Sequence, residues 1–151
     1  MVVHYTGAMD VRLYLPTDRE ACLKIFDSNA PHAFPPDSRA RFENFLDQAG
    51  ATYFVMEHDG AVIGCGGYRI GPEPSLATLA WGMVRQDSQK LGLGRFLLMY
   101  RLREIGKPGG IERVRLETPQ QSAAFFEGQG FKVVSMAHGR VEMVKKLTVC
   151  A

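Results

Sequence analysis

The sequence predicts an α/β fold in which helices cover both faces of a mixed sheet. Short stretches rich in β-branched and aromatic residues alternate along the 151-residue chain with segments of helical periodicity. The pair Asp59-Gly60 separates two of the apolar stretches and is typical of a β-hairpin. In the middle of the chain a strand, a glycine-rich loop, a helix and another strand follow one another, which implies a parallel strand pair. The predicted order is β α α β β β α β α β β.

The first predicted strand covers residues 11–15, where apolar and polar side chains alternate, and it ends at Pro16. A helix follows, because Thr17 or Asp18 can accept hydrogen bonds from its first amide groups. This helix is expected to end at residues 28–29. Residues 30–36 contain three prolines and therefore form neither a regular helix nor a central strand.

Asp37 or Ser38 is expected to start a second helix, which ends near Gly50. Residues 52–57 and 61–69 then form the two strands of the hairpin. The second of these strands contains three glycines, which indicates a bulge or a close approach of another backbone segment.

The second half of the chain begins with an apolar strand over residues 76–84. A helix is predicted over residues 95–105, and the next strand covers residues 114–117. A short helix over residues 122–127 precedes two final strands, residues 131–135 and 141–147. One face of the longer helix is formed by Gly94, Leu98, Arg101 or Leu102, and Ile105.

Length and composition indicate one globular domain covering residues 1–151. The net charge of +2 and the lack of a long basic run argue against a nucleic-acid or membrane-surface partner. No apolar run is long enough to cross a bilayer, and the first residues lack the pattern of a signal peptide. Met9 could serve as an alternative start, which would leave residues 1–8 outside the fold.

Cys22, Cys65 and Cys150 are an odd and scattered set, and none lies at a spacing typical of a metal site. No metal is therefore expected. Cys22 and Cys65 are expected to be small buried apolar residues. Free thiols favour a reducing, cytoplasmic location.

The glycine-rich loop of residues 89–95 lies between a predicted strand and a predicted helix. The first amide groups of that helix have no intrahelical partner, and together with the helix dipole they can bind a phosphate. Lys90 and Arg95 add positive charge. The loop lacks the Walker A pattern, and Leu97 stands where a third Rossmann glycine would be. The alternative is a glycine-rich connection that binds nothing.

Two motifs in this sequence resemble the signatures of the GNAT acetyltransferase superfamily. Gln89, Gly92 and Gly94 match [RQ]-x-x-G-x-[GA]. Residues 122–131, Ser-Ala-Ala-Phe-Phe-Glu-Gly-Gln-Gly-Phe, resemble the second signature, A-x-x-[LF]-Y-E-x-x-G-F. The resemblance extends over residues 11–147. It implies a mostly antiparallel sheet of about six to seven strands with a central, splayed parallel pair.

The resemblance also implies that acetyl-CoA binds between the strands of residues 76–84 and 114–117. Met83 and Val84 would pair with the pantetheine arm, and the Val84 N–H would polarise the thioester carbonyl. The pyrophosphate would rest on the backbone of Gln89, Lys90, Leu91, Gly92, Leu93, Gly94 and Arg95. The second motif would bring three further residues to the cofactor: Ser122, Phe125 and Phe126.

The sequence departs from the family pattern at both proton-transfer roles. Phe126 replaces the tyrosine commonly taken as the acid, so Ser122, Tyr68 or bulk water would serve, or no acid is needed. Residues 76–84 contain no carboxylate. The base would be Glu117 or a water chain reached by Glu73 or His138. Alternatively, Glu117 has a capping or ion-pair role.

His32, Phe34 and Tyr68 would contact the acetyl acceptor, although residues 30–36 could equally be a loop that only covers the core. The resemblance implies an acetyl-CoA-dependent N-acetyltransferase acting on a primary amine of a small molecule or a peptide. The alternative is a non-catalytic acyl-CoA-binding sensor or regulatory module. A longer acyl-CoA and a homodimer formed through the last strands also stay open.

Overall fold

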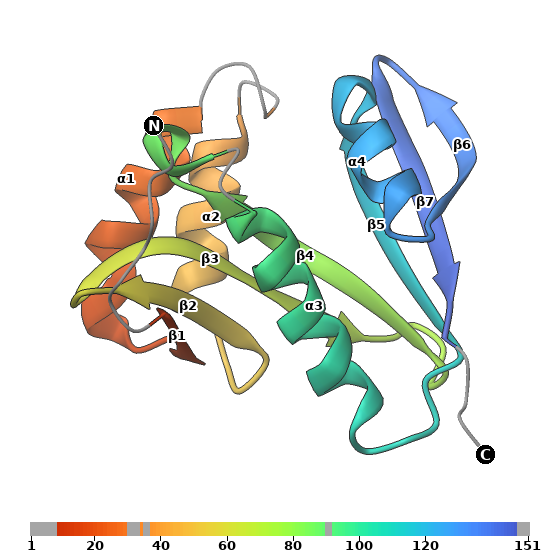
Figure 1. Ribbon diagram of the computed structural model, residues 1–151, viewed down its shortest axis with the longest axis horizontal. Helices are drawn as coiled ribbons and strands as arrows, with labels where there is room; N and C mark the ends of the chain where they lie inside the picture. Colours follow the sequence, from red (N-terminus) through yellow and green to blue (C-terminus); the bar gives the residue numbers. More distant parts are fainter. Residues whose placement is uncertain (1–8, 30–33, 35–36, 90–91, 148–151) are drawn as a thin grey trace. The chain divides into compact units, whose positions relative to one another are not determined.

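The computed structural model describes residues 9–29, 34, 37–89 and 92–147 (Figure 1). The helices and strands occur in the predicted order. The strands are β1 Met9–Leu13, β2 Tyr53–His58, β3 Ala61–Ile70, β4 Leu76–Val84, β5 Arg113–Pro119, β6 Lys132–Ala137 and β7 Arg140–Lys146. The α-helices are α1 Arg19–Asn29, α2 Ser38–Asp47, α3 Leu93–Gly106 and α4 Ala123–Gly128.

The strands form a seven-stranded sheet in the order β1-β2-β3-β4-β5-β7-β6. The pairs β1 with β2, β2 with β3, β5 with β7 and β6 with β7 are antiparallel. β4 and β5 are parallel, and their ladder joins residues 76–78 to residues 113–115. The predicted mixed sheet with a central parallel pair is confirmed.

The chain divides into two compact units. The first holds Met1–Gly67 and Trp81–Arg101, and the second holds Tyr68–Ala80 and Leu102–Ala151. The first unit therefore contains α1, α2, β1, β2 and the end of β4, whereas the second contains α4, β5, β6 and β7. The single domain expected from the sequence stays a prediction, and residues 1–8 lie outside the described part of the chain.

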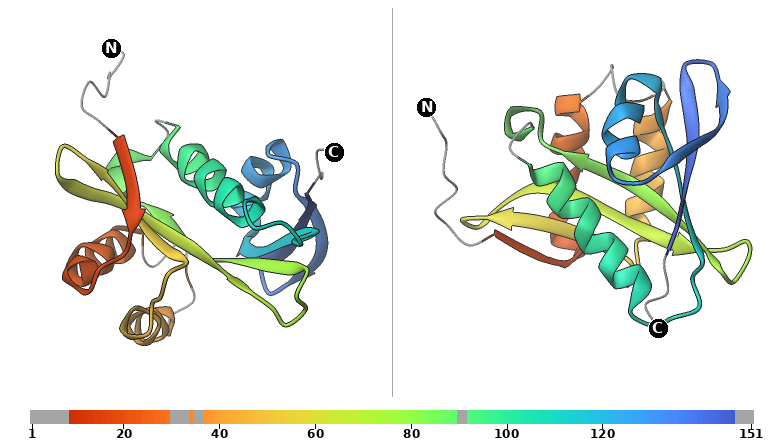
Figure 2. Two further views of the ribbon diagram at one scale, coloured as in Figure 1. Left: turned by 90° about the horizontal axis from the view of Figure 1, so that it is seen from below. Right: turned by 45° about the vertical axis from the view of Figure 1, so that its right-hand side comes forward.

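Helices pack on both faces of the strands in the first unit (Figure 2). On one face, α1 and α2 share a core with Tyr53 and Val55. On the other face, Leu97 of α3 shares a core with Met56. Val55 and Met56 are consecutive in β2 and point to opposite faces, as the pleat of a strand requires. Each large apolar side chain buried in this way stabilises the fold by about 1.5–3 kcal/mol.

β1 lies two residues earlier than expected from the sequence. It ends at Leu13, because the Leu15 N–H donates to an Asp18 carboxylate oxygen at 2.8 Å and the chain turns into a single 3-10 turn before α1. The Arg12 guanidinium also donates to Asp18, at 2.8 and 2.9 Å, and to Glu57 at 2.7 Å. These contacts tie the start of α1 to β1 and β2.

The β2–β3 hairpin turns at Asp59 and Gly60, as predicted. Their φ angles are 50° and 81°, the left-handed values of a two-residue type I′ turn. The predicted close approach along β3 is also confirmed. A Cβ atom on Gly67 would lie 2.1 Å from the Thr52 carbonyl oxygen, so only glycine fits there.

Two other elements are longer than the sequence suggests. α3 starts at Leu93 rather than Arg95, directly after Gly92, whose φ of 78° directs the chain into the helix. β5 runs to Pro119, because its ladder with β7 continues as far as the pair Pro119 and Arg140. The hydrophobic pattern does not predict this extension, because the second half of β5 contains polar residues.

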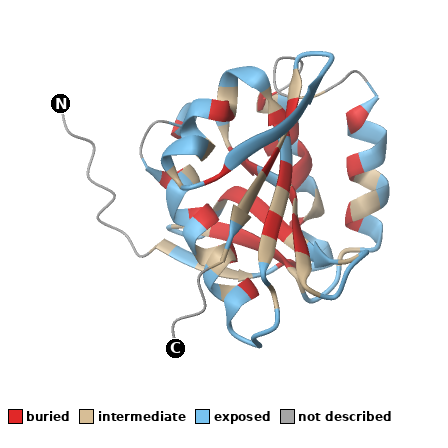
Figure 3. Cartoon of the chain, turned by 90° about the vertical axis from the view of Figure 1, so that its right-hand side faces the viewer, coloured by how far each residue is buried: buried red, intermediate tan, exposed pale blue. Residues whose placement is uncertain are grey.

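The core of the second unit lies along the middle of β5 and β7, where Val114, Leu116, Val141 and Met143 are buried. Figure 3 shows buried residues along the strands and also on the helices. Every residue of β6, by contrast, is exposed. None of the helices in the described ranges is both long enough and apolar enough to cross a membrane.

Candidate cofactor-binding and catalytic site

β4 changes direction at Trp81, which has a φ of 48°. A non-glycine residue adopts this left-handed conformation rarely and at a cost. The bend is held by the Tyr53 hydroxyl, which donates to the Trp81 carbonyl oxygen at 2.9 Å. The Trp81 ring is held by Phe42, whose ring centroid lies 5.0 Å away. Trp81 is therefore packed against the core, and its backbone conformation bends the strand that follows.

The carbonyl group of Val84, the last residue of β4, accepts two side-chain hydrogen bonds. Asn29 Nδ2 donates to it at 2.9 Å and Gln89 Nε2 donates to it at 3.1 Å. Gln89 Nε2 also donates to Asn29 Oδ1. The end of α1, the end of β4 and the start of the glycine loop are thus joined by one network of side-chain amides.

The hydrogen bonds on either side of residue 84 show in which direction the Val84 N–H points. The Arg85 N–H donates to the Ile63 carbonyl oxygen of β3 at 2.8 Å. Because the peptide is trans, the Val84 carbonyl points away from β3, toward Asn29 and Gln89. The N–H and C=O of one extended residue point to the same edge of a strand, so the Val84 N–H also points away from β3. This is the orientation that a donor to a bound thioester carbonyl needs.

The start of α3 supplies further donors. The first hydrogen bond of the helix runs from the Phe96 N–H to the Gly92 carbonyl oxygen at 3.1 Å, so the amides of Leu93, Gly94 and Arg95 precede it. A Cβ atom on Gly92 would meet nothing within 4 Å, which leaves open space beside these amides. Lys90 and Leu91 lie outside the described residues. The geometry fits the phosphate-binding role expected for this loop.

Phe34 lies in the first unit, and its ring stacks on Phe26 with centroids 4.7 Å apart. It also lies 6.1 Å from the Trp81 ring. Phe34 therefore adjoins the bend in β4, although its stacking on Phe26 is also what a loop covering the core would show. His32, the other residue expected on this loop, lies outside the described residues.

The remaining candidate residues belong to the second unit. The Phe126 ring packs edge-on against Phe125 and Phe131, with centroids 5.0 and 5.9 Å away. Ser122 is half-buried and precedes α4 without a side-chain capping hydrogen bond. Tyr68 is half-buried, and burial raises the pKa of its phenol.

Glu117 is exposed and forms an ion pair with Arg115 at 2.8 Å, which is the alternative role considered for it. Glu73 forms an ion pair with Arg113 at 2.7 Å. His138 lies exposed in the β6–β7 turn with a φ of 54°. All three candidate bases are exposed.

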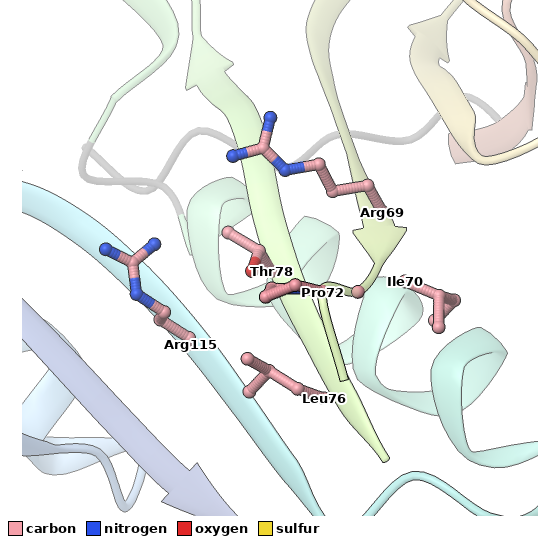
Figure 4. A pocket seen from close by; sticks show the side chains of 7 residues that line it. Arg69, Ile70, Pro72, Leu76, Thr78 and Arg115 are labelled. Carbon is pink, nitrogen blue, oxygen red and sulfur yellow. The ribbon is translucent and has the colours of Figure 1, made fainter. Parts of the chain in front are cut away.

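A cavity of about 520 Å³ lies within the second unit. Figure 4 shows the guanidinium groups of Arg69 and Arg115 on either side of Thr78, above a wall formed by Leu76 and Pro72. Arg115 donates to Glu117 and Glu142 and keeps further N–H groups for a ligand. Arg69 is exposed. The cavity is therefore suited to a carboxylate or phosphate group.

Sequence reasoning missed Asn29 and Tyr53, which fix the two ends of the bent segment of β4. Their hydrogen bonds join residues 55 and 28 positions apart in the chain. Nothing in the local sequence around either residue signals such a contact. Among the described residues, no group of three or more His, Cys, Asp or Glu side chains gathers in a way that could hold a metal ion.

Comparison with known proteins identifies the family of this chain. The sequence profile of the acetyltransferase (GNAT) family matches residues 19–131. The chain therefore belongs to the GNAT acetyltransferase family. Comparison with curated proteins gives no match.

Solved structures of several acetyltransferases share the fold. The ribosomal-protein-S18-alanine N-acetyltransferase of Escherichia coli is 23% identical, with a TM-score of 0.74 over 95% of this chain and 97% of that chain. PaiA N-acetyltransferase from Thermoplasma acidophilum, solved with coenzyme A, is 19% identical, with a TM-score of 0.73 over 93% of this chain and 99% of that one.

N-acetylglutamate synthase from Neisseria gonorrhoeae, solved with coenzyme A and N-acetyl-glutamate, is 19% identical, with a TM-score of 0.75 over 95% of this chain. This chain spans only 36% of the length of that enzyme. At these identities the likeness shows the fold alone.

Proposed function

We propose that this protein transfers an acetyl group from acetyl-CoA to a primary amine by direct attack of the amine on the thioester. The observation that carries this proposal is the backbone of Val84, whose carbonyl is held by the Asn29 and Gln89 side chains and whose N–H points to the same side, away from β3. A backbone donor fixed in this way stabilises the negative charge that develops on a carbonyl oxygen.

The amides at the start of α3 would hold the pyrophosphate of the co-substrate, and Met83 and Val84 would hold its pantetheine arm. Acetyl-CoA supplies an activated acyl group with a thiolate leaving group. The family membership and the coenzyme A in two of the related structures support this choice of co-substrate.

Proton transfer is left to groups other than Phe126, which has no proton to give. Because a thiolate is a tolerable leaving group, orientation of the two reactants and the Val84 donor can drive the reaction without a dedicated acid. Glu117 stays our candidate base, although its ion pair with Arg115 competes with that role. A water chain reached from Glu73 or His138 is the alternative.

We further propose that the amine acceptor carries an acidic group. The cavity flanked by Arg69 and Arg115, with the Thr78 hydroxyl between them, has the donors that a carboxylate or phosphate requires. His32, Phe34 and Tyr68 would contact the rest of the acceptor. Two related enzymes act on an amino acid or on the alanine of a protein, which supports an acceptor of either size.

The second candidate function is a non-catalytic acyl-CoA-binding module, and the observation that favours it is Phe126 packed between Phe125 and Phe131. Release of free CoA thiol in the presence of amines distinguishes the two functions. Steady release shows turnover, whereas acetyl-CoA binding without release from any amine shows a sensor or regulatory module.

Isothermal titration with acetyl-CoA tests the cofactor site. Gly92→Trp should abolish binding, because the indole would fill the open space beside the α3 amides. Gly109→Trp is the matched control, since Gly109 has the same φ of 78° and the same open surroundings but lies beyond the end of α3. If the folded parent does not bind acetyl-CoA, the proposed function is wrong.

A homodimer formed through β6 is also proposed. β6 is the last strand in the sheet order, and its Val134 and Met136 side chains are 55% and 60% exposed. A second copy could pair with this edge. Sedimentation of the parent and of a Met136→Lys variant tests this.

The free, buried thiols of Cys22 and Cys65 suit the reducing cytoplasm proposed as the location.

A further inference from the structure

Arg101 of α3 is a buried charged residue whose guanidinium is poorly satisfied. The residue is 5% exposed. Its Nη1 donates to the Gly67 carbonyl oxygen at a long 3.4 Å, and its Nε is buried with no hydrogen-bond partner. A buried polar group without partners is rare in native proteins and calls for a reason.

The guanidinium lies directly against the bent segment of β4. A Cβ atom on Gly82 would lie 2.7 Å from Nη2 and 2.8 Å from Nη1, and one on Gly66 would lie 3.3 Å from Cζ. Glycines in two neighbouring strands therefore make the space that Arg101 occupies. Trp81, next to Gly82, is the residue with the left-handed backbone.

Among the residues that the structure describes, no carboxylate balances the charge on Arg101. Burial lowers the pKa of its guanidinium to about 10, so the side chain remains a cation at neutral pH. Within the described ranges, the neighbours that favour its charged form are Tyr53 and Cys65, a phenol and a thiol. An apolar side chain would fill the same space without this desolvation cost. Natural proteins keep a buried, unpaired charge of this kind mainly at functional sites.

We propose that Arg101 provides a positive potential behind the bend of β4 that stabilises the negative charge formed during acetyl transfer. This inference rests on the proposed function. In that reaction the amine nitrogen forms a bond to the acyl carbon, the C–S bond breaks with its electron pair on sulfur, and the excess amine proton passes to the base, Glu117 or a water chain. The potential of Arg101 stabilises the thiolate, which compensates for the absence of a proton donor at Phe126.

The spacing along β4 gives the size of the effect. Val84 is two residues from Gly82, about 7 Å along an extended strand. The guanidinium contacts the Gly82 position, so it lies within about 10 Å of the Val84 N–H. For a thiol held beside the Val84 N–H, a unit charge about 10 Å away, with an effective dielectric constant of about 20, shifts the thiol pKa by about one unit and a rate by about tenfold. Arg101 contacts backbone atoms rather than the reacting groups. We therefore assign it an electrostatic supporting role and do not call it a catalytic residue.

The test compares Arg101→Met with the parent and with Arg103→Met, a control at an exposed position two residues along α3. The pKa of the CoA thiol in the binary complex is read from thiolate absorbance across pH. Arg101→Met should raise this pKa by about one unit and lower kcat by about tenfold, with KM for acetyl-CoA little changed. Its Tm should stay level or rise, because a desolvated charge is removed. Arg101→Lys keeps the positive charge, so its CoA thiol pKa and its kcat should both lie close to those of the parent.

A merely structural Arg101 gives a different pattern: Tm falls, whereas the thiol pKa and kcat of the folded variant match the parent. That result overturns the inference and leaves the proposed function standing. A parent that does not bind CoA overturns both. If Arg101→Met does not fold, Arg101→Gln supplies the neutral side chain, and an unchanged thiol pKa in that variant also overturns the inference.

Discussion

Replacement of Asn29 by alanine should separate the stability of the protein from its activity. Asn29 is 8% exposed, and its Nδ2 donates to the carbonyl oxygens of Ile25 and Val84, both at 2.9 Å. Asn29→Ala removes these bonds and the contact from Gln89. The Val84 carbonyl keeps its bond from Gln89, so we expect the free energy of unfolding to fall by only about 1–3 kcal/mol.

The effect on activity should be larger than this loss of stability suggests. With one of its two side-chain donors removed, the Val84 carbonyl is held less firmly, and a change in the Val84 backbone angles shifts its N–H. Misplacement of a catalytic donor by about 1 Å costs up to about a hundredfold in rate. We expect kcat to fall about 10- to 100-fold, with a smaller change in KM for acetyl-CoA. Asn29→Asp keeps the size of the side chain but cannot donate, and it places a carboxylate oxygen beside the Val84 carbonyl. It should therefore lose more activity than Asn29→Ala.

Denaturant unfolding and release of free CoA thiol measure the two quantities. Asn44→Ala, at an exposed position of α2, is the control and should change neither. If Asn29→Ala loses stability as expected but keeps kcat within about twofold of the parent, orientation of Val84 by Asn29 is not needed for activity. The reasoning from the amide network would then be refuted.

Three other predictions concern separate parts of the chain. The hydrogen bond from Arg12 lowers the pKa of Asp18, so this contact stabilises the fold above the unfolded pKa and is lost as pH falls through the lower folded value. Arg12→Met should therefore cost about 2 kcal/mol at pH 7, and the difference in denaturant midpoint should vanish in acid. Cys22 and Cys65, both 0% exposed, should react with a thiol reagent only after unfolding, and rapid reaction in the native state would contradict their burial. Arg69→Gln should raise KM about tenfold for an amine with an acidic group and leave KM unchanged for its neutral analogue; equal effects on both would count against the proposed acidic acceptor.

The hydrophobic pattern was sufficient to predict most of the fold. β4 has the predicted bounds because its sequence is almost entirely apolar. The Asp59-Gly60 turn formed because its residues tolerate positive φ, a local property that sequence shows directly. The predicted order of elements and the central parallel pair follow from the same local signals.

The candidate site was predictable only where it is made of backbone. Gly92 and the amides of α3 follow from a local motif. The left-handed Trp81 has no local signal, since bulky residues disfavour that conformation. The contact of Tyr53 with Trp81 depends on how distant elements pack. Arg101 falls on the same predicted helix face as Leu98 and Ile105, so the sequence could predict its burial. The sequence could not predict its contact with Gly82, which depends on how α3 packs on β4.

The exposed strand β6 has a consequence for how this protein behaves during folding and in concentrated solution. A chain whose sheet ends in open backbone donors and acceptors, flanked by Val134 and Met136, can recruit further strands without limit. The irregular register between Val133 and Ser135 and the charge of Lys132 interrupt the regular edge that such growth needs. Substitution of Lys132 by an apolar residue should therefore promote aggregation while leaving the free energy of unfolding almost unchanged.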